Sequence, residues 1–375
     1  MTQAGKIAVV AAPNQPLEMW QRDIPEVKPN DVLLKTIISG ICGTDVHEWR
    51  GRDKGLAFPT ILGHEIIGRI YDLGGKVTKD FFGKPVKQDD LVSVIYGIPC
   101  GACYFCLRGD YTKCADLKHL GSLRNTTNIH RAPFCFMGGF CDYVYIPEGF
   151  AGFIKLPEKL SSDLTAPFQC AGPTMLHGFE YVPIGLDESV VIQGSGPLGL
   201  FSVVYAKERW AGKIIMVGAP KGRLRMAERL GADHLIDINI TTDSNERIEQ
   251  VKDLTEGRGA DVVIECTGVP SAVNEGIAMS RAGGRYLVIG NWTDRGQVAI
   301  KPYSITFRQL HLHGSASYTP KHIYAYLRLL EKIKDKYPIR ELVTHKFELD
   351  QATEALEAME KGESTKAVFY FSKTK

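Results

Sequence analysis

Four closely spaced cysteines are the strongest chemical signal in the sequence. They follow the pattern C-x2-C-x2-C-x7-C in the segment PCGACYFCLRGDYTKC, at Cys100, Cys103, Cys106 and Cys114. Four thiolates can surround one zinc ion tetrahedrally, and such a closed shell leaves no position for water or substrate. The spacing therefore predicts a structural zinc site. An iron–sulfur cluster is the main alternative, but the ferredoxin spacing differs and no proline follows the last cysteine. Four free buried thiols are the remaining alternative.

A second group of possible ligands lies upstream of this loop. Cys42 stands in ISGICGTDVHEW, and His64 and Glu65 stand in ILGHEIIGRI, which begins 19 residues after Cys42. Thiolate, imidazole and carboxylate are all ligands that zinc accepts. Any one of these residues alone is more often a packed core residue than a ligand, so the interpretation depends on their neighbours.

The neighbouring motifs CGTDVH and GHE, together with the four-cysteine loop, resemble the zinc-dependent medium-chain dehydrogenase/reductase family over nearly the whole chain. The resemblance implies that Cys42, His64 and Cys170 hold a catalytic zinc, although other members place an acid at the position of Cys170. Glu65 would be an exchangeable fourth ligand, and Asp45 would orient His64. Zinc with two thiolates and a neutral imidazole is formally neutral and keeps one position open, as catalysis requires.

The chemistry implied by the resemblance is hydride transfer from an alcohol. An alcohol releases hydride readily only when its oxygen has lost a proton, and a Lewis acid makes that loss easier. Thr44 and His47 match the family's relay that carries the proton to solvent. The alternatives are an ordinary turn hydroxyl at Thr44 and an exposed histidine at His47.

A glycine motif predicts dinucleotide binding. Gly194, Gly196 and Gly199, with Pro197 and Leu198 between them, form G-x-G-x-x-G directly after an apolar strand and before a helical stretch. The first glycine permits a tight turn, the second lets a pyrophosphate approach the backbone, and the third lets helix and strand pack closely.

The sequence does not choose between NAD and NADP. Gly218 stands at the strand end where an acid would bind the ribose hydroxyls of NAD. Lys221 and Arg223 could attract the 2′-phosphate of NADP, or could be the solvated start of a helix. Gly43 occupies the position of a phosphate-binding arginine in some relatives, whereas Lys366 matches another basic position of the family and would supply a charge to the cofactor.

The resemblance also implies a substrate pocket between two domains. Its walls would include Trp49 and Tyr96, and Ile289 would line both the pocket and the cofactor site, but the two aromatic residues could equally belong to the core. The segment 115–140 could reshape the pocket entrance for a polyol, a cyclic secondary alcohol or an anion, or could be a solvated loop. Its polar residues include His119, Arg124, His130 and Arg131.

The elements that must position these residues change in kind along the chain. Up to about residue 149 the sequence has short β runs such as DVLLKTIISG, and after Leu164 apolar strands alternate with amphipathic helices. We expect an α/β protein: a β-rich catalytic domain, GroES-like as the resemblance implies, and a doubly wound Rossmann domain. The expected boundaries are 1–175 for the catalytic domain, 176–320 for the Rossmann domain and 321–375 for a segment that returns to the first.

Composition limits the partners. The 375 residues include 44% hydrophobic and 23% charged residues, and 45 Lys and Arg against 43 Asp and Glu give a net charge of +2. No bulk charge recruits nucleic acid, and no apolar run would span a membrane. Small molecules are therefore the expected partners. Nine unevenly clustered cysteines favour metal ligation in a reducing cytoplasm, and the family resemblance implies a homodimer or homotetramer.

The resulting hypothesis is a zinc-dependent oxidoreductase with two zinc ions per chain. It would transfer a hydride reversibly between a primary or secondary alcohol and NAD(P)+. A zinc-free quinone or enone reductase on the same fold is one alternative. A non-catalytic NADPH-binding redox sensor is another. Zinc content separates these hypotheses.

Overall fold

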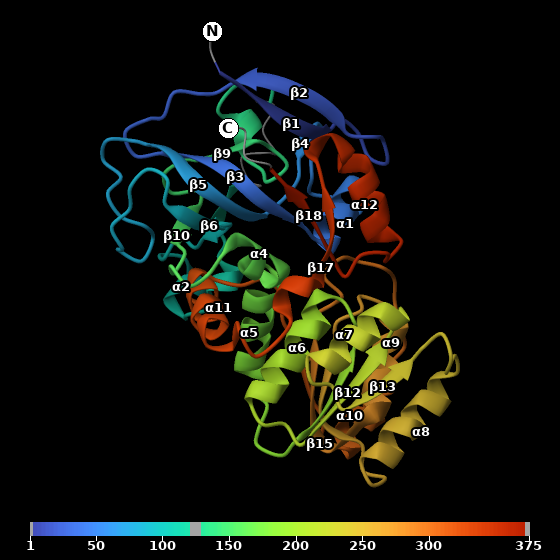
Figure 1. Ribbon diagram of the computed structural model, residues 1–375. Coiled ribbons are helices and arrows are strands. Elements are labelled where there is room, and N and C mark those ends of the chain that lie inside the picture. The colour runs from blue at the N-terminus through green and yellow to red at the C-terminus, as the bar shows by residue number, and fades with distance from the viewer. Residues whose placement is uncertain (1–2, 121–128, 372–375) are drawn as a thin grey trace. The chain divides into compact units, whose positions relative to one another are not determined.

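The computed structural model describes residues 3–120 and 129–371, which form two compact units (Figure 1). The first unit contains the chain up to Cys170, Thr319–Lys332 and the part from Ile339 onward, and the second contains Ala171–Tyr318 and Ile333–Pro338. The division thus precedes helix α5 (Ala171–Tyr181), whereas the expected boundary at 175/176 would cut through it. Helix α5 packs along α6 (Pro197–Glu208), so it belongs with the second unit as a whole.

The first unit is built on a seven-stranded sheet with the order β10-β6-β5-β3-β18-β17, in which β9 also pairs with β3. A three-stranded sheet, β2-β1-β4, and a small pair, β7-β8, complete it. The strands are β1 (Ala4–Val10), β2 (Glu18–Asp23), β3 (Val32–Ile41), β4 (Thr60–Ile61), β5 (Glu65–Leu73), β6 (Leu91–Ile95), β7 (Gly97–Ile98), β8 (Lys118–His119), β9 (Tyr143–Ile146), β10 (Gly152–Lys155), β17 (Val343–Phe347) and β18 (Lys366–Tyr370).

The first unit also contains five α-helices among its described residues. They are α1 (Gly43–Trp49), α2 (Tyr104–Leu107), α4 (Ser162–Thr165), α11 (Pro320–Ile333) and α12 (Ala352–Glu360). Strand β3 is buried along nearly its whole length because it has β5 on one side and, on the other side, β9 along its first half and β18 along its second half. Helix α1 starts directly beyond the end of β3 and packs on α12, as Figure 1 shows beside β18.

The second unit is a six-stranded, fully parallel sheet with the order β13-β12-β11-β14-β15-β16. Its strands are β11 (Ser189–Gln193), β12 (Lys213–Gly218), β13 (His234–Asp237), β14 (Ala260–Glu265), β15 (Ser280–Val288) and β16 (His311–Gly314). The remaining helices are α7 (Lys221–Arg229), α8 (Ser244–Leu254), α9 (Pro270–Met279) and α10 (Pro302–Phe307). The strand order reverses between β11 and β14. Right-handed crossovers therefore place α6 and α7 on one face and α8 and α9 on the other.

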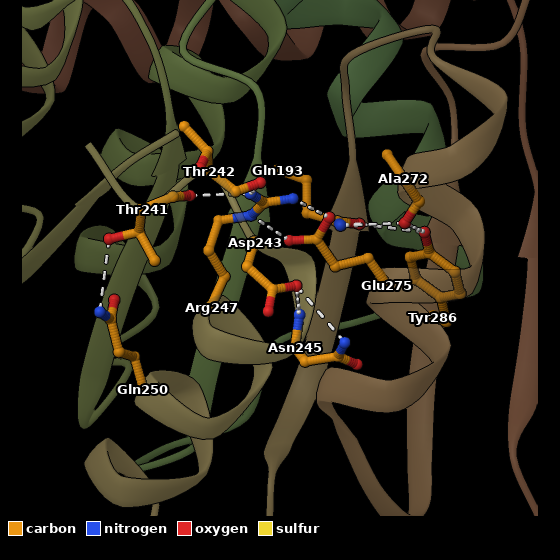
Figure 2. Close-up of polar contacts among 10 residues, drawn as sticks. All are labelled: Gln193, Thr241, Thr242, Asp243, Asn245, Arg247, Gln250, Ala272, Glu275 and Tyr286. Atoms are coloured by element: carbon orange, nitrogen blue, oxygen red, sulfur yellow. Dashed lines mark hydrogen bonds and ion pairs between the residues drawn. The ribbon is translucent and has the colours of Figure 1, made fainter. Parts of the chain in front are cut away.

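Side-chain hydrogen bonds connect α8 with α9, and α9 with the sheet (Figure 2). Arg247 of α8 donates two hydrogen bonds of 2.7 Å to Glu275 of α9, and both side chains are about nine-tenths buried. Gln193 at the end of β11 donates to the carbonyl of Ala272 and accepts from Tyr286 of β15. These bonds fix α9 against the sheet. Within residues 3–120 and 129–371, no helix has the length and apolar character needed to cross a bilayer.

Candidate active site

Three predicted ligands and Glu65 converge in the first unit. The ligand atoms of Cys42, His64, Glu65 and Cys170 all lie within 4.8 Å of one another. Two sulfurs, one imidazole nitrogen and one carboxylate oxygen form a donor set that suits zinc. The residues present therefore fit a catalytic zinc, with Cys42, His64 and Cys170 as its protein ligands and Glu65 within reach.

Asp45 organises two of these ligands through the backbone. Cys42 is the N-cap of α1, and its N–H donates to the Asp45 carboxylate at 2.7 Å. The other carboxylate oxygen accepts from the N–H of Gly63, next to His64, at 2.9 Å. The distance from this oxygen to Nδ1 of His64 is 3.7 Å, which is longer than a hydrogen bond. Asp45, which is fully buried, thus fixes the segments that carry the ligands as well as facing the imidazole.

Cys170 is held by the residue before it. The Gln169 amide donates to the carbonyl of Ile66 at 2.7 Å and to the Ser93 hydroxyl at 2.9 Å, on strands β5 and β6. Gln169 is 3% exposed, so these bonds form away from water and anchor the end of the segment to the sheet. The sequence analysis did not identify this role.

The site favours one negative sulfur beside a positive imidazole. The hydrogen bond between Cys42 and Cys170 lowers the pKa of Cys42 well below its ordinary value and raises the pKa of Cys170. Burial opposes a charge on His64, but the Asp45 carboxylate and the hydrogen bonds with Cys170 and Cys42 together outweigh it and raise the pKa of His64. Cation binding requires both sulfurs as thiolates and a neutral imidazole, so it would release protons.

Glu65 forms a buried ion pair with Lys366. The ammonium lies 2.5 Å from the carboxylate and also donates to the carbonyl of Ile41 at 3.1 Å, and the two side chains are 3% and 2% exposed. Burial raises the pKa of Glu65 to about 7, against the opposing effect of Lys366. The positive charge that Lys366 was expected to supply to the cofactor is therefore already neutralised by Glu65. A Cβ at Gly40 would lie 2.2 Å from the Glu65 carboxylate, so this packing requires a glycine that the sequence analysis missed.

The four-cysteine loop gathers its sulfurs as its spacing predicts. All four sulfurs lie within 4.8 Å of one another, with 4.0 Å between Cys100 and Cys106 and 3.9 Å between Cys103 and Cys114. Zinc–sulfur bonds of about 2.3 Å in a tetrahedron give sulfur separations of about 3.8 Å. The geometry therefore fits a structural zinc.

Thiolate formation in this loop has local support. A hydrogen bond from the backbone N–H of Cys106 lowers the pKa of Cys103 to about 6. Loss of solvent around Cys106 raises the pKa of that thiol to about 12. A bound cation would have to overcome this second effect, and a divalent metal deprotonates a coordinating thiol outright.

The glycine motif in the second unit forms a strand–turn–helix. Gly194 has a φ of +104°, which a residue with a Cβ rarely adopts, and a Cβ at Gly199 would lie 1.8 Å from the carbonyl oxygen of Gly194. Gly196 is the N-cap of α6, with open space where its Cβ would be, and Pro197 and Leu198 begin the helix. Backbone N–H groups at such a helix start suit an anionic pyrophosphate.

The end of β12 has no room for an acid. A Cβ at Gly218 would lie 2.9 Å from Oγ of Ser195, which donates to the carbonyl of Ala219 at 2.7 Å. Lys221 is the first residue of α7 and is exposed. Arg223, two residues later, is partly buried, and this burial lowers the pKa of its guanidinium. These positions remain open to either NAD or NADP.

Two family models match the chain. "Alcohol dehydrogenase GroES-like domain" matches residues 28–158, and "Zinc-binding dehydrogenase" matches residues 197–332. The 5-exo-hydroxycamphor dehydrogenase of Pseudomonas putida is 36% identical over 98% of this chain and 98% of its own length. The chain belongs to the zinc-dependent medium-chain dehydrogenase family. It is therefore an enzyme of the zinc- and NAD(P)-dependent dehydrogenases, as its motifs indicate.

Other relatives support the same assignment for this dehydrogenase. The L-threonine 3-dehydrogenase of Pyrococcus horikoshii is 31% identical, covering 95% of this chain and 96% of its own. An alcohol dehydrogenase structure from Thermotoga maritima has a TM-score of 0.90 at 31% identity, over 98% and 99% of the two chains. A candidate zinc-binding dehydrogenase from Sinorhizobium meliloti, solved with NADP, has a TM-score of 0.82 at 26% identity, over 98% and 100%. The predicted combination of a GroES-like domain and a Rossmann domain is confirmed.

The expected pocket residues of the dehydrogenase lie in different environments. Trp49 is 2% exposed, belongs to the main core of the first unit and donates its indole N–H to Gln15, so it packs the core. Tyr96 is half-buried, with its ring edge-on to His64 at 5.6 Å between ring centres. The ring centre of His119 also lies 5.2 Å from that of Tyr96. Ile289 is 5% exposed. Tyr96 is thus the aromatic residue that borders the ligand set.

The segment 115–140 is only partly a polar loop. Its strand β8 pairs with β7, and its later part contributes Cys135, Phe136 and Phe140 to the core, all fully buried. His130 stacks on Trp20 at 5.2 Å, and Arg131 is exposed. Arg124 lies outside the described residues. The uncharged, apolar run PFCFMGGF marks this buried part, although the rest of the segment is mostly polar.

Proposed function

We propose that this dehydrogenase transfers a hydride between an alcohol and NAD(P)+, giving an aldehyde or ketone reversibly. The observation that carries the proposal is the convergence of Cys42, His64 and Cys170 on one small volume, with Glu65 beside them. Zinc held there would supply the Lewis acidity that favours loss of the alcohol proton. A zinc-free reductase on the same fold would have no use for this donor set.

We assign the proton relay to Thr44 and His47. They stand three residues apart on α1, on one face of the helix, and Thr44 Oγ1 lies 3.8 Å from Sγ of Cys42. Nδ1 of His47 lies 3.3 Å from the Arg52 guanidinium, which can only donate, so the neutral imidazole carries its proton on Nε2. The partly exposed ring of His47 can exchange a proton with water.

Within the alcohols, we propose a secondary alcohol as substrate. Hydroxycamphor and threonine, in the names of the two relatives described above, each carry a secondary hydroxyl group. Tyr96 and His119 would contact the part of the substrate next to the reacting carbon, because the Tyr96 ring lies against both His64 and His119. An aromatic face beside an imidazole suits either a cyclic alcohol or a polyol.

We further propose two zinc ions per chain, a homo-oligomer and a cytoplasmic location. The two clusters of ligands support the zinc count. Strand β16 lies at one end of the parallel sheet, and no strand in the described part of the chain pairs with its outer edge, which a second copy could extend. No disulfide joins any of the nine cysteines, all of which lie in the described residues, as a reducing compartment favours.

The test combines metal analysis with an alcohol screen. Purified protein should contain two zinc ions per chain and should reduce NAD+ or NADP+, measured by absorbance, with a panel of cyclic alcohols, polyols and primary alcohols. Cys42→Ser should abolish turnover while the nucleotide still binds. Cys135→Ser is the matched control, because Cys135 is buried in the same unit but belongs to neither ligand cluster. Zinc-free protein, or unchanged turnover in Cys42→Ser, would refute the proposal and favour the zinc-free reductase or the redox sensor.

A further inference from the structure

Glu65 is not the only buried acid at a candidate site. Glu265, the last residue of β14, is fully buried, and its carboxylate accepts five hydrogen bonds. One oxygen accepts from the N–H of Thr267 at 2.6 Å, the hydroxyl of Thr267 at 2.7 Å and the N–H of Gly268 at 2.7 Å. The other accepts from the N–H of Gly290 at 3.1 Å and the side-chain amide of Asn291 at 2.9 Å. One carboxylate thus joins the loop after β14 to the loop after β15.

These two loops lie at the edge of the sheet where the glycine motif lies. Parallel strands end at the same edge, and β14 pairs with β11, which leads into the glycine turn. The N–H of Cys266 donates to the carbonyl of Gln193 at 2.8 Å, and a Cβ at Gly194 would lie 3.0 Å from the Cys266 carbonyl carbon. The loop after β14 is therefore packed directly on the glycine turn.

The topology assigns a half of the cofactor to each side of this turn. The strand order reverses between β11 and β14, and in open parallel sheets a dinucleotide crosses the carboxyl edge at such a point. The adenosine ribose belongs at the end of β12, beside Gly218, and the pyrophosphate at the start of α6. The nicotinamide half must then lie on the other side of β11, over the ends of β14 and β15.

The partners of Glu265 in the described part of the chain are all uncharged: backbone amides, a hydroxyl and a carboxamide. A buried carboxylate without a cation is costly unless its oxygens are saturated with donors. Only a carboxylate has one acceptor oxygen for the donors of each of the two loops. A glutamine side chain has one oxygen, so it would leave donors of one loop facing its own amide N–H groups.

We propose that Glu265 is the positioning residue that holds the loops 266–268 and 290–291 in the arrangement that receives the nicotinamide half of the cofactor. This inference rests on the proposed function. Because both oxygens of Glu265 are occupied by donors from the two loops, it would act on the cofactor through these loops and not by touching it.

The test separates the two halves of the nucleotide. Glu265→Gln should raise the Kd for NADH or NADPH, whichever the wild type binds more tightly, by about tenfold or more. ADP-ribose, which lacks nicotinamide, should bind with an unchanged Kd. Both constants are measured by titration calorimetry on the full-length, zinc-loaded protein. Asn291→Ala, which removes a single donor, should raise the dinucleotide Kd less and keeps the test available if Glu265→Gln does not fold.

Asp261→Asn is the matched control. Asp261 lies in the same strand, four residues earlier, and its carboxylate accepts from the N–H and hydroxyl of Ser189 and from Arg281 at the opposite edge of the sheet. It should lower stability without changing either Kd.

An unchanged dinucleotide Kd in both Glu265→Gln and Asn291→Ala would overturn the inference. So would an equal loss of ADP-ribose binding, or the same loss of dinucleotide binding in Asp261→Asn. A wild-type protein that bound ADP-ribose but transferred no hydride from any alcohol would contradict the proposed function alone.

Discussion

Replacement of Lys366 by methionine tests whether this lysine is a structural partner of Glu65 or a cofactor ligand. The change keeps most of the side-chain volume and removes the charge. Charges about 4 Å apart at an effective dielectric constant of about 20 attract by about 4 kcal/mol. Removing one partner of a buried pair typically costs about 3–5 kcal/mol. Because the two side chains are 3% and 2% exposed, we expect Lys366→Met to lower the free energy of unfolding of the first unit by that amount.

Two further variants make this prediction specific. Lys366→Met/Glu65→Gln should recover most of the loss, because it leaves no unpaired buried charge. Lys6→Met is the matched control. Lys6 pairs with Asp350 in the same unit, but those side chains are 45% and 58% exposed, so its effect should stay below about 1 kcal/mol.

Urea unfolding of the zinc-loaded protein measures these differences. Trp49, 2% exposed, should dominate the fluorescence change, because Trp210 and Trp292 of the second unit are already 75% and 50% exposed in the folded protein. The change therefore reports mainly on the first unit. The reasoning is wrong if Lys366→Met is no more harmful than Lys6→Met, or if the added Glu65→Gln makes it worse. Weaker nucleotide binding with unchanged unfolding would instead favour the cofactor role that the family resemblance implied.

Three other perturbations probe the remaining features. Cys106→Ser should reduce the zinc content from two ions per chain to one and lower the thermal midpoint, since a closed thiolate shell contributes directly to folding. Metal analysis measures the zinc content and calorimetry the midpoint. Retention of two ions would contradict the assignment. Gly199→Ala should destabilise the second unit by about 1–3 kcal/mol, because its Cβ would lie 1.8 Å from the carbonyl of Gly194, whereas Gly222→Ala in α7 meets open space and should be neutral or stabilising in urea unfolding; equal effects would contradict this packing argument. Burial alone would raise the pKa of Asp261, but bonds from Ser189 and Arg281 hold it below 3.8, so its stabilisation is present above pH 3.8 and is lost as the pH falls through the lower folded value. The stability difference between the wild type and Asp261→Asn should therefore shrink in acid, and a constant difference in urea midpoints would show that ionisation is not its source.

The parts of the candidate site that could be predicted are those with short-range patterns. Zinc ligands in a loop must recur every few residues to reach one ion, so C-x2-C-x2-C-x7-C is visible without a structure. The glycine motif is equally local, since strand, turn and helix start lie within one segment. The family assignment and the fold class followed from these motifs and are confirmed.

Contacts between distant residues could not be predicted in this way. Glu65 and Lys366 are 301 positions apart, and nothing in either neighbourhood specifies the other. Trp49 lies two residues after the end of the CGTDVH motif, but only the packing of α1 shows that its indole points into the core. A lone buried acid such as Glu265 has no spacing signature, because its partners are mostly backbone N–H groups, which every residue but proline carries.

Asp45 in the first unit and Glu265 in the second both accept hydrogen bonds from backbone N–H groups that lie beyond the ends of strands. Both are fully buried, and both follow or end a strand where the ladder of backbone hydrogen bonds stops. Donors beyond a strand end have no ladder partner, yet these segments carry the metal ligands or the expected cofactor contacts. A carboxylate with two acceptor oxygens can gather N–H groups from two segments at once: Cys42 and Gly63 at the first site, Thr267 and Gly290 at the second. Each acid therefore holds two segments beyond the strand ends in fixed positions.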